Sequence, residues 1–191
     1  MKQTLLIITA VMLVVGCGSS EKELEKEPEI EPEKEPINID ELVGRDGIWH
    51  SKDTNKPYSG PVFSLYENGQ KSGEGTLKDG EQDGLSTSWY DNGQKWTEGT
   101  YKDGKPDGLL TVWYKYGQKR YEETFKDGKQ DGKVTLWYEN GQKQSELTIK
   151  DGKEDGNLTR WYENGQKQSE ETWKDGKQIE LTEWDEDGNE Y

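Results

Sequence analysis

A seven-residue segment is repeated along this chain at a constant spacing. Trp-Tyr-Glu-Asn-Gly-Gln-Lys occupies residues 137–143 and recurs unchanged at residues 161–167. Related versions begin at Leu65, Trp89 and Trp113, so each copy starts 24 residues after the previous one. A second motif, Lys-Asp-Gly, keeps the same period and begins at Lys78, Lys102, Lys126, Lys150 and Lys174. A fixed period in this range indicates copies of one supersecondary unit, which restricts the chain to a repeat architecture.

Each repeat is predicted to contain two antiparallel strands. The stretch that leads into the repeated motif, such as residues 108–114, is rich in strand-forming residues. An apolar residue precedes every Lys-Asp-Gly, which predicts the return strand, and Asp-Gly-Lys-x-Asp-Gly, as at residues 103–108, predicts the turn into the next repeat. Because no stretch keeps a 3.6-residue apolar period, we expect no substantial helix beyond the N-terminal segment.

The Asn-Gly pairs predict the tight end of each hairpin, with both turn residues at positive φ. They are Asn68-Gly69, Asn92-Gly93, Asn140-Gly141 and Asn164-Gly165. The third repeat has Tyr116-Gly117 in their place. Since that turn keeps only its glycine, we predict that it is the weakest of the five.

These patterns predict an all-β fold, an elongated single-layer antiparallel sheet of consecutive β-hairpins. Five repeats fill residues 60–178. Residues 37–59 are predicted to form an entry hairpin that caps the array, with strands at 42–43 and 48–50 and a turn at 52–56. Residues 179–191 form a terminal partial repeat, in which Glu180 and Glu183 discourage another sheet from pairing with the last strand.

The motif itself resembles a known repeat. Gly-x(4)-Trp-Tyr-x-Asn-Gly, followed by an apolar residue and Lys-Asp-Gly-Lys-x-Asp-Gly, resembles the bacterial variant of the MORN repeat, and residues 57–60 resemble the segment that often precedes such arrays. The resemblance implies consecutive hairpins in one twisted sheet and no shared catalytic residues. It also implies relatives among YwqK-type antitoxin-like proteins, and among MORN arrays that act as scaffolds or attach to membranes.

Residues 1–16 have the features of an export signal. Lys2 supplies a positive charge, an apolar run of 11 residues follows from Leu5 to Val15, and small Gly16 precedes the only cysteine, Cys17. Residues 14–17 resemble the bacterial lipobox, which implies lipidation of Cys17 and a lipid-anchored, exported protein at the cell membrane or outer membrane. A buried thiol at the end of a hydrophobic segment is the alternative for Cys17. As the sole cysteine, it excludes an intrachain disulfide.

Residues 17–36 are predicted to be a disordered acidic tether between the lipid and the folded part. Residues 21–36 contain eight Glu and three Lys and have almost no apolar surface to bury. A solvated spacer is the simpler interpretation, and a lipoprotein sorting signal is the alternative.

The charge of the whole chain limits its partners. The formal net charge of −15 argues against nucleic acid, because phosphate contacts require clustered Lys and Arg. It also disfavours anionic lipid headgroups as a direct ligand. The membrane is therefore expected as a partner only through Cys17, and MORN arrays that bind phosphoinositides through basic patches are a poor model for this one.

The sequence predicts neither an enzyme nor a cofactor site. It contains no nucleophile elbow, phosphate loop or zinc-protease motif, and His50 is its only histidine. No unrepeated carboxylate pair is predicted. The acids that recur once per repeat are interpreted as a structural row: Glu74, Glu98, Glu122, Glu146 and Glu170. Calcium binding by the Asp-Gly-Lys-x-Asp-Gly turns is an alternative, although the lysine between the carboxylates opposes a cation.

The recurring tryptophans form the candidate binding surface, which we call the Trp stripe: Trp89, Trp113, Trp137 and Trp161. Equivalent positions place them on one face, and strand alternation directs the following tyrosines to the other. The rings either pack along the sheet or grip a glycan, peptide or protein. The sequence thus predicts a non-catalytic binding or scaffold module. The alternatives are an antitoxin-like immunity protein that binds its toxin, and a surface protein that binds calcium or cell-wall glycan.

Overall fold

The computed structural model describes residues 34–191, which form one folded unit. The predicted export signal, Cys17 and most of the acidic tether lie outside these residues. Within them, no helix is long and apolar enough to cross a membrane.

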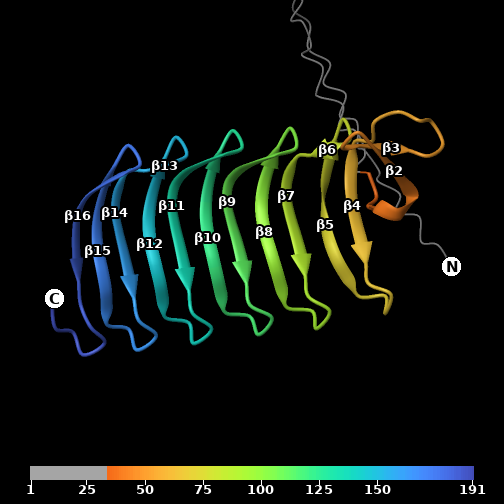
Figure 1. Cartoon of the computed structure of the whole chain (residues 1–191). Coiled ribbons are helices and arrows are strands. Elements are labelled where there is room, and N and C mark those ends of the chain that lie inside the picture. Colours follow the sequence, from red (N-terminus) through yellow and green to blue (C-terminus); the bar gives the residue numbers. More distant parts are fainter. Residues whose placement is uncertain (1–33) are drawn as a thin grey trace, which may run out of the picture. The chain divides into compact units, whose positions relative to one another are not determined.

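The repeats form the consecutive hairpins of one sheet (Figure 1). Its main strands, each paired with the next, are β4 Gly60–Leu65, β5 Lys71–Lys78, β7 Gly84–Trp89, β8 Lys95–Lys102, β9 Lys105–Trp113, β10 Lys119–Lys126, β11 Lys129–Trp137, β12 Lys143–Lys150, β14 Gly156–Trp161, β15 Lys167–Lys174 and β16 Lys177–Glu183. The short strands β6 Glu81–Gln82 and β13 Lys153–Glu154 extend the turns between repeats. The predicted all-β sheet of hairpins is therefore confirmed.

One strand departs from the antiparallel pattern. β1, Ile37–Asn38, pairs with β4 in parallel, so the sheet begins with a mixed edge. A short 3₁₀ turn, Ile39–Glu41, then leads into a separate two-stranded sheet of β2, Leu42–Arg45, and β3, Ile48–Ser51. The turn between β2 and β3 is Asp46-Gly47, with φ of 51° and 82°, and residues 52–56 follow β3. The Ser51 N–H donates to the Lys56 carbonyl (2.9 Å), so the predicted turn at residues 52–56 is present, whereas the two-residue Asp-Gly turn between the strands was not predicted.

This entry hairpin covers the start of the array. Leu42, Val62 and Leu77 form a buried cluster, against which Trp49 and Tyr58 pack. The Trp49 N–H donates to the Gly80 carbonyl (2.9 Å), and the Gly80 N–H donates to the Tyr58 carbonyl (2.8 Å). The cap is thus fixed both by apolar burial and by backbone hydrogen bonds to the first Lys-Asp-Gly turn.

The sequence predicts positive φ at both residues of the Asn-Gly turns, but in the structure this geometry belongs to the Asp-Gly turns. At Asn68-Gly69 only the glycine has positive φ (82°), whereas Asp79-Gly80 has φ of 50° and 84°. The Asn-Gly turn is a wider loop, closed by a hydrogen bond from the Tyr66 N–H to the Gln70 carbonyl (2.8 Å). The prediction for Asn-Gly was wrong because the asparagine acts through its side chain, whose Oδ1 accepts from the Gln70 N–H at 3.0 Å.

The third repeat lacks this asparagine. Asn92 accepts a hydrogen bond from the Gln94 N–H (3.0 Å) and donates through Nδ2 to the Lys115 carbonyl of the next loop (2.8 Å). Asn140 and Asn164 make the same two contacts. In the third repeat, Tyr116 occupies this position and is 79% exposed.

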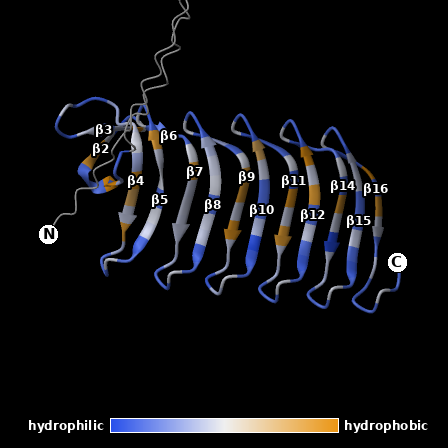
Figure 2. Cartoon of the chain, turned by 180° about the vertical axis from the view of Figure 1, so that it is seen from behind, coloured by the Kyte–Doolittle hydropathy of each residue, from blue (hydrophilic) through white to orange (hydrophobic). Residues whose placement is uncertain are grey.

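Neither face of the sheet has a second layer along most of its length. Apart from the entry hairpin, no helix or strand of residues 34–191 covers it. Figure 2 shows hydrophobic residues spread over strands such as β4, β9, β11 and β14, with hydrophilic turns at both ends. Strand alternation places the buried apolar residues opposite the Trp stripe, on what we call the reverse face: Val62, Leu77, Val134, Ile149 and Leu158.

Replacing Tyr116 by Asn is expected to stabilise the protein. The new side chain would accept from the Gln118 N–H and donate to the Glu139 carbonyl, the two contacts found in neighbouring repeats. We expect the free energy of unfolding to rise by about 1 kcal/mol in total, because each of the two exposed hydrogen bonds contributes only a fraction of that value. Urea denaturation measures it, with Asn92→Tyr as the opposite change. An unchanged denaturation midpoint in both variants would contradict the role given to asparagine.

Gly80→Ala is expected to destabilise the protein more than Gly152→Ala. Both glycines have positive φ (84° and 77°), so alanine is strained at either site. An added Cβ at Gly80 would lie 2.6 Å from the Trp49 carbonyl oxygen, whereas at Gly152 it would meet open space. The difference in melting temperature between the two variants reports the docking of the entry hairpin. Equal losses would show that the hairpin is not held there.

Candidate functional site

The Trp stripe lies at the ends of equivalent strands. Trp89, Trp113, Trp137 and Trp161 are the last residues of β7, β9, β11 and β14. Their side chains share one face with the threonines two residues earlier, such as Thr87, and all four residues are half-buried. Trp184, just after β16, continues the row at a spacing of 23 residues.

Each ring of the stripe carries a lysine from the preceding repeat. The Nζ atoms lie between 5.6 and 5.8 Å from the ring centroids, in the pairs Lys71–Trp89, Lys95–Trp113, Lys119–Trp137, Lys143–Trp161 and Lys167–Trp184. These distances are those of cation–π contacts. One side of every ring is therefore already occupied by a cation of the chain itself.

The same lysines bind the recurring glutamates. Each Nζ pairs with the carboxylate three residues later, as in Lys71–Glu74 (2.6 Å) and Lys143–Glu146 (2.5 Å), and the pairs from the other repeats are Lys95–Glu98, Lys119–Glu122 and Lys167–Glu170. At Glu146, hydrogen bonds from Lys133 and Lys143 lower the pKa of the carboxyl. We call these groups the Trp–Lys–Glu triads. Their recurrence agrees with the structural interpretation of the glutamate row.

The tyrosines connect the repeats at the loop end of the strands. Each Tyr hydroxyl donates to the backbone carbonyl of the next Trp along the array, at distances between 2.5 and 3.0 Å: Tyr66 to Trp89, Tyr90 to Trp113, Tyr114 to Trp137, Tyr138 to Trp161 and Tyr162 to Trp184. Each of these hydroxyls therefore already donates its hydrogen bond within the protein.

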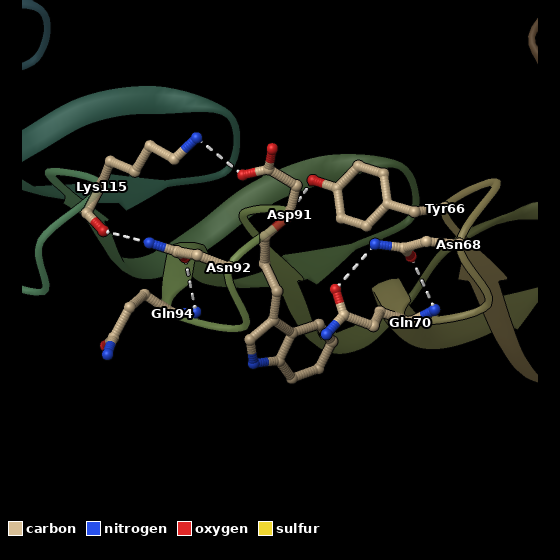
Figure 3. Close-up of polar contacts among 8 residues, drawn as sticks. Tyr66, Asn68, Gln70, Asp91, Asn92, Gln94 and Lys115 are labelled. Atoms are coloured by element: carbon tan, nitrogen blue, oxygen red, sulfur yellow. Dashed lines mark hydrogen bonds and ion pairs between the residues drawn. The ribbon is translucent and has the colours of Figure 1, made fainter.

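Charged side chains add a further contact between two of the loops. Figure 3 shows Lys115 paired with Asp91 across the loops, beside the Asn92 contact to the Lys115 carbonyl. Lys115 Nζ lies 2.8 Å from Asp91 Oδ1. The hydrogen bond and charge of Lys115 lower the pKa of Asp91, while Asp91 raises the pKa of Lys115.

The reverse face contains two acids that sequence reasoning missed. Glu123 and Glu171 are buried, with 3% and 6% of their surface exposed. They break the repeat, because the same position holds Gly75, Gly99 and Leu147 in the other repeats. Superposing the five repeats and separating the strand faces would have revealed them, whereas the sequence analysis looked only for an unrepeated carboxylate pair.

Glu123 and Glu171 do not form a catalytic pair. They lie on β10 and β15, four strand positions apart in the sheet. At about 4.8 Å per strand, roughly 19 Å separate them, whereas paired glycosidase carboxylates lie about 5–10 Å apart. Their distance therefore gives no support to glycoside hydrolysis.

The described residues also offer no assembled metal site. Among residues 34–191, no group of three or more His, Cys, Asp or Glu side chains is arranged to hold an ion. In the Asp-Gly-Lys-x-Asp-Gly turn at residues 151–156, Lys174 Nζ binds Asp155 Oδ2 at 2.9 Å and lowers the pKa of that carboxyl. His50 contacts the Ile48 carbonyl through Nδ1 at 3.0 Å.

Comparison with known families agrees with the hairpin architecture. Three segments match the model described as the MORN repeat variant: residues 82–103, 130–151 and 154–175. Each covers a strand pair with its adjoining turn, in register with the 24-residue period. No curated protein matched the sequence. The three matches and the array of hairpins together support a MORN-repeat protein.

Proposed function

We propose that this chain is a non-catalytic binding or scaffold module that is held at a membrane through Cys17. MORN repeats suggest a binding or scaffold role built on repetition, and the family is generally non-enzymatic. The lipobox-like residues 14–17 support the anchor. Two or more acyl chains on one cysteine give stable membrane attachment, whereas a single chain binds only marginally.

One observation carries the choice of surface: the two faces of the sheet differ in how they repeat. The Trp face presents the same triad in successive repeats, and these groups contact one another. The reverse face changes from repeat to repeat. The position just before the Trp, or before Leu65 in the first repeat, holds Ser64, Ser88, Val112, Leu136 and Arg160.

Recurring residues are needed to join one repeat to the next, so they have little freedom to recognise a partner. Residues that vary between repeats are free of that requirement. The reverse face also exposes part of its apolar surface, since Val112 and Leu136 are only half-buried and no layer of the described residues covers them. A face that is open, partly apolar and different in each repeat is suited to a protein partner.

The Trp stripe is the second candidate surface. Its triads recur every two strands, or about 10 Å, and this regular spacing would suit a polymer such as a glycan. A ligand stacking on these rings would have to use the side that lysine leaves open. The Lys and Glu of each triad would supply the hydrogen bonds at its rim.

Replacing Cys17 by Ser is expected to abolish lipid attachment. Serine lacks the thiol that carries the acyl chain, so cells fed radiolabelled palmitate should label the natural protein and leave the variant unlabelled. The natural protein should sediment with membranes, and the variant should lose that association. A labelled Cys17→Ser variant would refute the proposed anchor.

A photocrosslinking amino acid placed at Leu136 is expected to capture a partner in intact cells. Leu136 lies on the reverse face. Thr148, which is exposed and belongs to no triad, lies on the Trp face and serves as the matched site.

Crosslinks from Leu136 alone would support the reverse face, and crosslinks from Thr148 alone would favour the Trp stripe. Mass spectrometry of the products decides between them, and no crosslink from either site would count against a binding function.

A further inference from the structure

The carboxylate of Glu123 is buried on the reverse face and is only half satisfied. Its Oε2 accepts a hydrogen bond from the Tyr121 hydroxyl. Its Oε1 is buried and has no hydrogen-bond partner among residues 34–191. A buried acceptor without a donor costs about 1–3 kcal/mol, and more when it is charged. This oxygen therefore has an unfilled requirement for a donor.

The fifth repeat shows which group meets that requirement. Glu171 occupies the equivalent position 48 residues later and pairs with Arg160. It also accepts from Trp173 Nε1 (2.9 Å) and, at longer distance, from Gln178 Nε2 (3.3 Å). The third repeat keeps a glutamine, Gln130, at the position of Gln178. It lacks both the cation and the indole donor, because Phe125 stands where the fifth repeat has Trp173.

Two substitutions remove the internal cation from the third repeat. Val112 stands where the fifth repeat has Arg160, and Tyr121 stands where it has Ser169. In both repeats these two positions are cross-strand partners, so the comparison is made in the same register. The surroundings of Glu123 are thus apolar on the side from which Arg160 approaches Glu171.

An open pocket lies beside this site. Its volume is about 380 Å³, and it is lined by Val112, Tyr114, Arg120, Tyr121, Leu136 and Gln144. Glu123 does not line the pocket itself, but Tyr121 does, and its hydroxyl bonds to the Glu123 carboxylate. Burial and the hydrogen bond to Glu123 raise the pKa of Tyr121, which keeps its hydroxyl a donor. Arg120 lies 5.7 Å from the Tyr114 ring centroid, in a cation–π contact.

We propose that this pocket receives an arginine side chain from a partner protein, with the guanidinium paired to Glu123. The aliphatic part of the arginine would contact Val112 and Leu136, and the planar cation would take the place that Arg160 has beside Glu171. The net charge of −15 favours a basic segment as the partner. This inference rests on the proposed binding function and specifies the chemistry of one repeat.

The test uses the full chain and a short peptide with one arginine between two leucines, followed by nuclear magnetic resonance. The peptide is expected to shift the amide signals of Val112, Tyr121 and Leu136. Replacing arginine by citrulline, which keeps the shape and removes the charge, should weaken binding at least tenfold. Glu123→Gln should have the same effect, whereas Glu139→Gln, which changes an exposed acid outside the triads, should leave binding unchanged.

A second variant supplies the missing cation from within the chain. Val112→Arg combined with Tyr121→Ser places the equivalents of Arg160 and Ser169 beside Glu123, so the internal arginine should abolish peptide binding. Equal binding of the arginine and citrulline peptides to the natural protein would overturn the proposal, and that comparison needs no variant to fold. Absence of peptide binding would overturn it as well. Either result would leave the proposed binding function intact if Leu136 still crosslinks to a partner in cells.

Discussion

The contact between successive repeats is the constraint on which the rest of this structure depends. A single hairpin exposes both of its faces and is marginally stable in water. Here each hairpin is joined to the next by a Tyr hydroxyl on a Trp carbonyl and by a lysine above the Trp ring. These contacts require the same residues at the same place in every repeat, which explains why the sequence repeats so closely. They also compensate for a small number of buried aliphatic residues.

This requirement makes the two faces of the sheet different. The Trp face holds the groups that connect repeats, including lysines that each serve a ring and a glutamate. Apart from the tyrosines at its loop end, the reverse face does not carry that role, so one of its strand positions can hold glycine in one repeat and glutamate in another. The acids Glu123 and Glu171 illustrate the result, because they occupy one position yet have different partners. A face that differs between repeats gives a repetitive protein a site found only once.

Sequence reasoning succeeded where one physical cause controls the pattern, and it failed where two causes compete. The strands and their order follow from a period that hardly varies. The Asn-Gly turn was misassigned because asparagine favours both a left-handed backbone conformation and a side-chain hydrogen bond to its own loop. Only the structure shows that the hydrogen bond is the one used here. The role of Tyr66 and its equivalents was missed because their acceptor is a carbonyl 23 residues away.

The sequence by itself determined the hairpin repeat, the number of units, the face on which the tryptophans lie and the acidic character of the surface. These properties depend on residue spacing, strand alternation and composition, all of which are local. Only the tertiary structure decided that a lysine lies over each ring of the Trp stripe, that the entry hairpin docks on the Gly80 turn, and that Glu123 lacks the cation given to Glu171. Each of these depends on which side chains meet across strands, and that is set by register and burial in the folded sheet.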